Sequence, residues 1–209
     1  PKDSEGQKSH LKAYGITYWV LNKQQNVKWL LNYRGGSFLI PFVDSIKKEC
    51  LIRGVSYELI SNQQVESILN EINSPNKNMD AVVLEKAPKI AVYSPNGNQP
   101  WDDAVTMVLT YAEIPYETIY DTEVLNDALL LYDWLHLHHE DFTGQYGKFY
   151  RAYRNAAWYI DQQQAAEKLA LSLGYSKVSD QKLAVAKKIR EYVLGGGFMF
   201  AMCSATDSF

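Results

Sequence analysis

Short runs of apolar residues, separated by polar turns, mark the first part of the chain. Residues 14–21 (YGITYWVL) and 27–33 are rich in β-branched and aromatic side chains, and a polar turn lies between them. Such a pair of runs is typical of a β-hairpin. Two glycines then precede residues 37–40, where we expect a third short strand. Residues 1–10 are polar, and we expect them to be mobile.

Two helices with recognisable ends are predicted next. Asp44 is a candidate N-cap for a helix over 44–53, and Gly54 fits the position after the helix, where glycine adopts a left-handed conformation cheaply. Ser61 is followed three residues later by Gln64, which predicts a capping box for a helix through residue 72.

The segments around these helices complete an N-terminal portion, residues 1–88. Residues 55–60 (VSYELI) read as a strand. Residues 73–88 carry turn residues and no clear periodicity, so we expect a linker or wrapping segment. The sequence therefore predicts a hairpin-containing α/β portion that ends in a linker.

From residue 89 the pattern changes to strands that alternate with helices. The expected strands are 89–94, 116–120, 132–138 and 198–203, and the expected helices are 101–113, 158–173 and 180–194. This alternation predicts an α/β domain over 89–209, with a mainly parallel sheet and helices on both faces. Because a helix normally follows the last strand of such a sheet, we expect the natural protein to continue beyond Phe209.

Composition excludes several classes of protein. The chain has 209 residues, of which 46% are hydrophobic and 22% charged, and this excludes a disordered, collagen-like or coiled-coil chain. A net charge of −3 gives no indication of the basic surface that nucleic-acid-binding proteins usually have. No apolar run approaches the roughly 20 residues of a membrane span. Aromatic residues make up 13% of the chain, which fits either a tyrosine-rich surface or a platform for a glycan or peptide.

Cys203 is the strongest candidate for a catalytic residue. It falls at the carboxyl end of an expected parallel strand, where open α/β sheets bind ligands. A nucleophile on a sharp turn between strand and helix can use backbone N–H groups as an oxyanion hole, and a helix N-terminus lowers a thiol pKa. The alternative is an inert, buried thiol, because free cysteine is among the most buried residue types.

Histidines and carboxylates cluster between His136 and Asp141 (HLHHED). His138 or His139 could act as the base for Cys203, since a base need only lie next to its nucleophile in space. Glu140 is a candidate substrate-binding residue. The three histidines and two carboxylates of this run could instead hold Zn²⁺, although no standard zinc spacing is present, and no metal is predicted. A third interpretation is that these polar groups satisfy the loop backbone.

The loop 94–102 offers a candidate anion cradle. Backbone amides near Ser94, Asn96 and Gly97, with that of Ser204, could hold an oxyanion, because a helix is expected to start within this loop. The loop lacks a phosphate-binding or dinucleotide glycine pattern, so no cofactor is predicted. It fits equally well a plain connection or the rim of a site.

The segments KIAVYS, YDWLHLHH and GGGFMFAMCSATDSF resemble the class I glutamine amidotransferase-like superfamily. With HLKAYGITYW and WLLNYRGGSFLIP, they are similar to a family of uncharacterised bacterial proteins automatically labelled asparagine synthetase B. The superfamily resemblance implies a flavodoxin-like three-layer sheet with Cys203 at a nucleophile elbow. The elbow glycines are replaced here by Ala201 and Ala205.

The resemblance also bears on activity and location. Asparagine synthetases use an N-terminal cysteine, whereas this sequence has none before Cys50, so asparagine synthesis is not predicted. Members of the closer family often begin with an export signal, which implies a periplasmic protein; otherwise the protein is cytoplasmic. Two functions stay open: a non-catalytic glycan- or protein-binding envelope protein, and a cysteine-dependent amide or ester hydrolase or amidotransferase.

Overall fold

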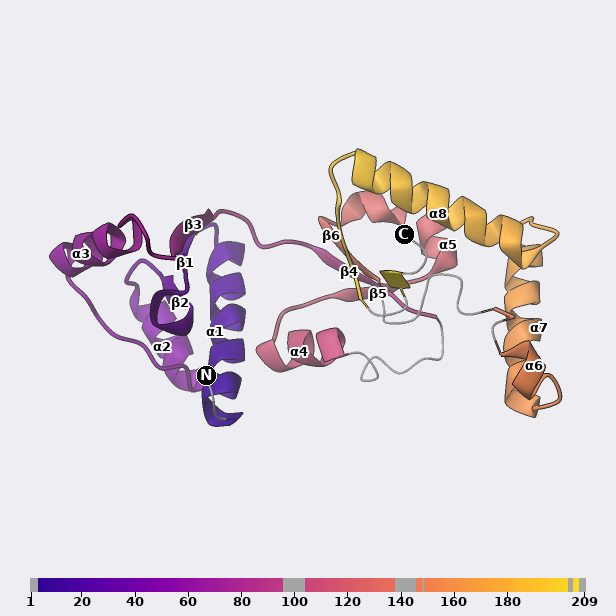
Figure 1. Ribbon diagram of the computed structural model, residues 1–209, viewed down its shortest axis with the longest axis horizontal. Helices are drawn as coiled ribbons and strands as arrows, with labels where there is room; N and C mark the ends of the chain where they lie inside the picture. The colour runs from indigo at the N-terminus through magenta and orange to yellow at the C-terminus, as the bar shows by residue number, and fades with distance from the viewer. Residues whose placement is uncertain (1–3, 96–103, 138–145, 148, 203–204, 207–209) are drawn as a thin grey trace. The chain divides into compact units, whose positions relative to one another are not determined.

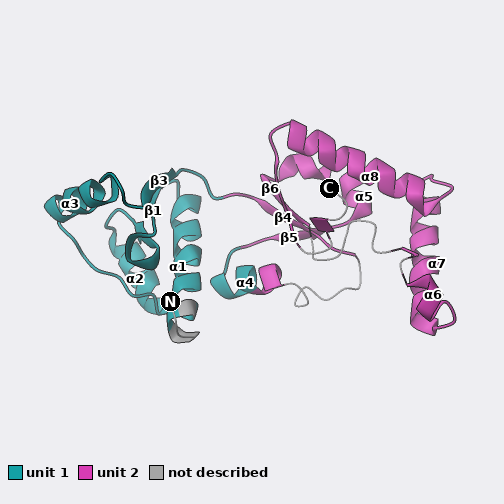
Figure 2. Ribbon diagram, in the orientation of Figure 1, with its two compact units in different colours: residues 1–87, 108–114 teal, residues 88–107, 115–209 magenta. Residues whose placement is uncertain are grey.

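The structure is a computed structural model that describes residues 4–95, 104–137, 146–147, 149–202 and 205–206. The chain forms two compact units (Figure 2). Unit 1 comprises residues 1–87 and 108–114, and unit 2 comprises residues 88–107 and 115–209. Each unit has its own sheet and its own core of buried apolar side chains.

Unit 1 is built from three helices and a small antiparallel sheet in its described part (Figure 1). Its elements are α1 (Ser4–Asn22), β1 (Val27–Leu31), the 3₁₀ turn η1 (Tyr33–Gly35), β2 (Ser37–Leu39), α2 (Asp44–Arg53), α3 (Asn62–Ile72) and β3 (Asp80–Leu84). The strand order is β2-β1-β3, and Trp29 on β1 is paired with Phe38 and Val82 on the two outer strands. Both outer strands are therefore edges of this sheet.

The predicted N-terminal hairpin is wrong, because residues 14–21 belong to helix α1. Ile16 and Val20 are buried one helical turn apart and pack with Ile46 and Cys50 of α2. Almost every side chain in YGITYWVL is apolar or aromatic, so the helical period is not visible in the sequence, and packing overrides the β-branched composition. The prediction that residues 1–10 are mobile is also wrong for residues 4–10, because these residues begin the same helix.

Three further predictions in unit 1 fail. Residues 55–60 form no strand in the structure, although the segment alternates as a strand would. The expected linker 73–88 contains β3, which pairs along its whole length with β1. In contrast, the predictions for 37–40, 44–53 and 61–72 are confirmed as β2, α2 and α3, and that for 27–33 is confirmed as β1 as far as Leu31. The predicted N-cap Asp44 is wrong: it is the first residue of α2, and Val43 stands at the N-cap without a side-chain cap.

Unit 2 contains the predicted parallel sheet. Its elements are β4 (Ile90–Tyr93), α4 (Ala104–Ala112, whose end belongs to unit 1), β5 (Glu117–Ile119), α5 (Asp121–Leu125), η3 (Ala128–Leu131), β6 (Trp134–Leu137), α6 (Tyr150–Tyr153), α7 (Ala157–Ser172), α8 (Val178–Leu194) and β7 (Phe198–Ala201). The strand order is β5-β4-β6-β7, and all pairs are parallel. The α/β class and a parallel sheet flanked by helices are confirmed.

One face of this sheet carries the core of unit 2. Tyr93, Leu135 and Leu137 pack against Val185 and Ile189 of α8, with α5 completing the layer. On the opposite face Val92 and His136 are also buried, whereas Phe198 and Phe200 of the edge strand are exposed. Among the described helices, none combines the length and hydropathy that crossing a bilayer requires.

Candidate functional site

The carboxyl edge of the parallel sheet is the first place where a site is expected. Tyr93, Leu137 and Ala201 are aligned across β4, β6 and β7, so these three strands end in register. The chain leaves β4 towards β5 on one side, while β6 lies on the other side, which is the crossover arrangement where open α/β sheets bind ligands. The expected crevice therefore lies between the carboxyl ends of β4 and β6.

Most of the predicted site residues lie outside the described residues. These are Asn96, Gly97, His138, His139, Glu140, Cys203 and Ser204. Ser94 is described: it is buried, and its backbone N–H donates a hydrogen bond to the carbonyl oxygen of Ile119 at 3.0 Å. This bond occupies the donor that the anion-cradle hypothesis would use at Ser94. The predicted roles of the other residues stay predictions.

His136 is the described member of the histidine cluster. It lies within β6, is fully buried, and stacks on Phe200 of β7 with ring centroids 6.0 Å apart. Its ring also meets the indole of Trp134 edge-on. His136 is therefore part of a sheet face, one residue before the strand end. Among the described residues no group of three His, Cys, Asp or Glu side chains has the spacing of a metal site.

A buried polar cluster lies at the ends of β4 and β5 and was not predicted. The Lys182 Nζ of α8 is 2.6 Å from Oδ2 of Asp121 and 3.0 Å from the hydroxyl oxygen of Tyr120. Tyr93 donates its hydroxyl proton to the other carboxylate oxygen of Asp121. A signal existed in the sequence: Lys182 falls four residues after Val178 and three before Val185, on the apolar face of α8.

The positive and negative charges of this cluster balance each other. Asp121 is fully buried and Lys182 is only 5% exposed, and the two charges neutralise each other. A buried, paired and hydrogen-bonded ion pair fixes geometry, but it offers no net charge to a ligand. The cluster therefore anchors α8 to the ends of β4 and β5, and a binding site has to be sought elsewhere.

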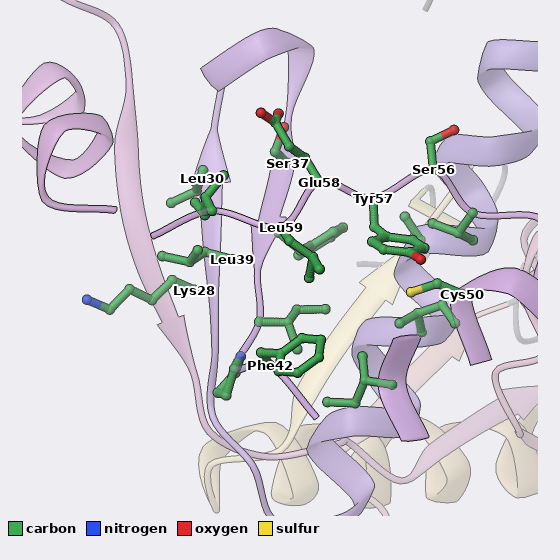
Figure 3. Close-up of a pocket in the computed structure, with 18 of the residues that line it drawn as sticks. Lys28, Leu30, Ser37, Leu39, Phe42, Cys50, Ser56, Tyr57, Glu58 and Leu59 are labelled. Carbon is green, nitrogen blue, oxygen red and sulfur yellow. The ribbon is translucent and has the colours of Figure 1, made fainter. Parts of the chain in front are cut away.

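A groove with a volume of about 1110 Å³ lies within unit 1. Residues of α1, β1, β2, α2, α3 and the extended segment between α2 and α3 line it (Figure 3). Its apolar lining includes Leu30, Leu39, Phe42, Ile46, Tyr57 and Leu59. We call this feature the unit 1 groove.

Several apolar side chains of the unit 1 groove remain in contact with solvent. Phe42 is 62% exposed and Leu59 is 59% exposed, while Leu30 and Ile46 are buried in the wall. A contiguous apolar surface of this kind is costly in water and marks interaction sites in monomeric proteins. The groove is thus an apolar surface that an occupant would cover.

The groove also carries an excess of positive charge. Arg34 pairs with Glu58 at 3.0 Å, so these two charges cancel. Lys28 and Lys47 also line the groove, and neither has an ion-pair partner among the described residues. Burial raises the pKa of Cys50, which keeps this thiol of the groove wall protonated at neutral pH.

Sequence reasoning missed this groove for an identifiable reason. It assigned residues 55–60 to a strand, which would have placed Tyr57 and Leu59 in a sheet. In the structure the segment runs as an extended chain without a strand partner, so these side chains line a hollow instead.

No family, no curated protein and no solved structure matches the chain in the comparisons with known proteins.

Proposed function

We propose that this chain is a non-catalytic binding protein and that the unit 1 groove is its binding site. The observation that carries the proposal is the apolar groove of about 1110 Å³, with exposed Phe42, Tyr57 and Leu59 along it. Covering apolar surface releases roughly 25 cal/mol per Å², which is the main driving force for association. The proposed activity is recognition of a ligand with apolar groups.

The chemistry of the lining distinguishes between the two ligand classes left open by the sequence. Glycan sites present polar side chains that converge on hydroxyl groups, whereas this groove is formed mainly by aliphatic and aromatic side chains. Its charged groups are the Arg34–Glu58 pair and two lysines. This lining supports an apolar partner over a sugar.

The scaffold and location belong to the same proposal. We take the parallel order β5-β4-β6-β7 as support for an amidotransferase-like scaffold whose binding function lies in the N-terminal unit. The resemblance of residues 195–209 to that superfamily supports the same assignment. The resemblance to the closer bacterial family supports an exported, envelope location.

Binding of the fluorescent apolar anion 8-anilinonaphthalene-1-sulfonate (ANS) tests the proposal. The double variant Phe42→Ala/Leu59→Ala removes two exposed groove side chains and should weaken ANS binding roughly tenfold. The matched control is Leu51→Ala/Ile52→Ala, which removes two exposed apolar side chains of α2 that do not line the groove. Equal loss in both variants, with near-ultraviolet circular dichroism unchanged, would refute a binding role for the groove.

A second candidate function has one observation in its favour. Tyr93, Leu137 and Ala201 are aligned at one edge of the sheet. In the sequence Ser94 follows the first of these residues, His138 follows the second, and Cys203 comes two positions after the third. A cysteine-dependent hydrolase or amidotransferase would need a thiolate there. Timed alkylation across pH tests this function with Cys50 as internal control: a fast reaction of Cys203 with an apparent pKa well below about 8.5 supports the enzyme, and inertness until unfolding excludes it.

A further inference from the structure

We infer that the unit 1 groove takes an extended peptide segment of a protein partner, with apolar and acidic side chains sharing the alternate positions that face the groove. This inference rests on the proposed function and specifies the ligand of the same site. Three features support it: an unpaired extended segment in the groove wall, the alternation of its side chains, and the uncompensated lysines.

The first feature is the backbone of Ser56–Ile60, which we call segment 56–60. It is extended but belongs to neither sheet, and among the described residues its N–H and C=O groups form no hydrogen bond with other backbone groups. An extended chain with unpaired backbone groups is a template for an added strand. Peptide recognition by strand addition obtains its affinity from this kind of main-chain pairing.

Segment 56–60 is anchored at both ends and in its middle. At one end the N–H of Val55 donates to the carbonyl oxygen of Cys50 at 2.8 Å, and at the other Ser61 begins the capping box of α3. In the middle, Glu58 is held by Arg34 across 3.0 Å. These contacts fix the ends of the segment and leave its backbone open, which reduces the entropy that a binding peptide must offset.

The second feature is the orientation of its side chains. Tyr57 and Leu59 point to one side of the segment, and Ser56 and Glu58 point to the other (Figure 3). Tyr57 is 41% exposed and, with Leu59, lines the groove. Because side chains of a paired strand alternate in the same way, apolar groups at alternate positions of the peptide would meet Tyr57 and Leu59.

The third feature is charge. Lys28 of β1 and Lys47 of α2 line the groove from two different elements, and no acidic side chain of the described residues pairs with either. Acidic residues at the peptide positions that face the groove would meet these ammonium groups, because the intervening side chains point to the opposite side, as those of Ser56 and Glu58 do. Complementary charge fixes the orientation of a partner and excludes basic sequences.

Selection from a library of random seven-residue peptides displayed on phage tests the inference, with bound ANS as the competitor that reports occupancy of the groove. We expect the selected peptides to carry apolar and acidic residues at positions two apart, on one face of an extended chain, and to displace ANS. The variant Lys28→Glu/Lys47→Glu should weaken their binding at least about tenfold. The matched control Lys48→Glu, an exposed lysine of α2 outside the groove, should change it less than about twofold.

A separate experiment tests the backbone pairing between the peptide and segment 56–60. Two N-methylated versions of each selected peptide are compared, one methylated at the odd-numbered residues and one at the even-numbered residues. Each version lacks half of the backbone N–H donors. The version that lacks the donors facing segment 56–60 should bind at least about tenfold more weakly than the other. Near-ultraviolet circular dichroism of each variant confirms that unit 1 is folded. Lys28→Gln/Lys47→Gln serves as a second variant if charge reversal disturbs folding.

Each other outcome overturns the inference. Recovery of no peptide, or of peptides insensitive to Lys28, Lys47 and N-methylation, excludes an acidic strand as the ligand. Displacement of ANS by dodecanoate alone identifies an amphiphile, and displacement that depends only on protein concentration identifies a second copy of the chain. Those two results keep the proposed function, whereas failure of ANS to bind in the groove refutes the proposed function itself.

Discussion

Lys182 and Asp121 form an ion pair inside unit 2, with Nζ 2.6 Å from Oδ2 and the carboxylate fully buried. Asp121 is the first residue of α5 and Lys182 belongs to α8, so the pair joins two helices of the layer that covers one sheet face. The hydroxyl groups of Tyr93 and Tyr120 complete the set of hydrogen bonds around it. This pair holds together the strand ends at which the sheet would bind a ligand.

Removing one partner of this pair should be strongly destabilising. Lys182→Met leaves the Asp121 carboxylate buried and uncompensated, which costs about 3–5 kcal/mol in comparable pairs. Lys182→Met/Asp121→Asn removes both charges and keeps an oxygen acceptor for Tyr93, so it should recover most of the loss. Urea unfolding followed by circular dichroism measures both.

The control is Lys188→Met, which breaks the solvent-screened pair with Asp127 and should cost far less stability than Lys182→Met. If Lys182→Met cost as little as this control, the buried cluster would not stabilise unit 2.

Gly15 marks a close approach within unit 1. A Cβ at this position of α1 would lie 1.8 Å from the carbonyl oxygen of Ala112, which belongs to the same unit. Gly15→Ala should therefore destabilise unit 1 by at least about 1–3 kcal/mol, despite the better helix propensity of alanine.

Gly54→Ala provides the comparison, because it meets no atom within 4 Å but has a φ of +67°. It should cost only about 1 kcal/mol. Hydrogen-exchange protection of α1 measures both changes, and a Gly15→Ala chain at least as protected as wild type would contradict the close packing.

The capping box of α3 should set the stability of that helix. Ser61 Oγ accepts from the N–H of Gln64, and the Gln64 side chain accepts from the N–H of Ser61. Ser61→Ala should cost about 1 kcal/mol and speed amide exchange in the first turn of α3. Ser67→Ala, on the exposed side of the same helix, should leave that exchange unchanged. Equal exchange in the two variants would show that the cap is not formed in solution.

The charge on Glu113 should make unit 1 sensitive to acid. A hydrogen bond from Lys12 at 2.6 Å lowers the pKa of Glu113, and the charge of Arg53 lowers it further. A carboxyl pKa lowered by folding adds stability above its unfolded value of about 4.3, and this stability is lost as the pH falls through the lower folded value.

Titration by NMR should therefore show a Glu113 pKa below the usual range, and Lys12→Met should move it upwards. Lys48→Met, an exposed lysine elsewhere in unit 1, should leave it in place. An unchanged Glu113 pKa in the Lys12→Met chain would mean that the pair does not form.

Local signals in the sequence predicted the elements that local physics controls. Gly54 ends α2 with a φ of +67°, as the rule for helix ends requires, and the spacing of Ser61 and Gln64 identified α3. The apolar strand 90–93 and its parallel neighbours were equally visible, because buried parallel strands are continuous apolar runs. Long-range packing controls the remainder. Helix α1 has a strand-like composition and becomes helical against α2, and β3 lies in a segment rich in turn residues.

The residues of the candidate sites show the same difference between local signals, which are visible in the sequence, and long-range packing, which is not. Chemistry-bearing residues such as Cys203 and His138 stood out in the sequence, and they lie outside the described residues. The unit 1 groove could not be predicted from the sequence, since part of its wall is segment 56–60, which was predicted as a strand and forms none. Lys182 gave a weaker signal as a charged residue on an apolar helix face, and its partner Asp121 lies 61 positions away.

The thiol of Cys50 offers the most direct measurement of occupancy in the unit 1 groove. Cys50 lines the groove and is 5% exposed, and in a Cys203→Ser chain it is the only thiol. Its raised pKa makes alkylation slow, so the reaction is best followed at pH 9 by intact-protein mass spectrometry. Saturating ANS, and later a selected peptide, should slow alkylation of Cys50 several-fold. An unchanged alkylation rate with ANS demonstrably bound would place the ligand elsewhere and contradict the groove as the binding site.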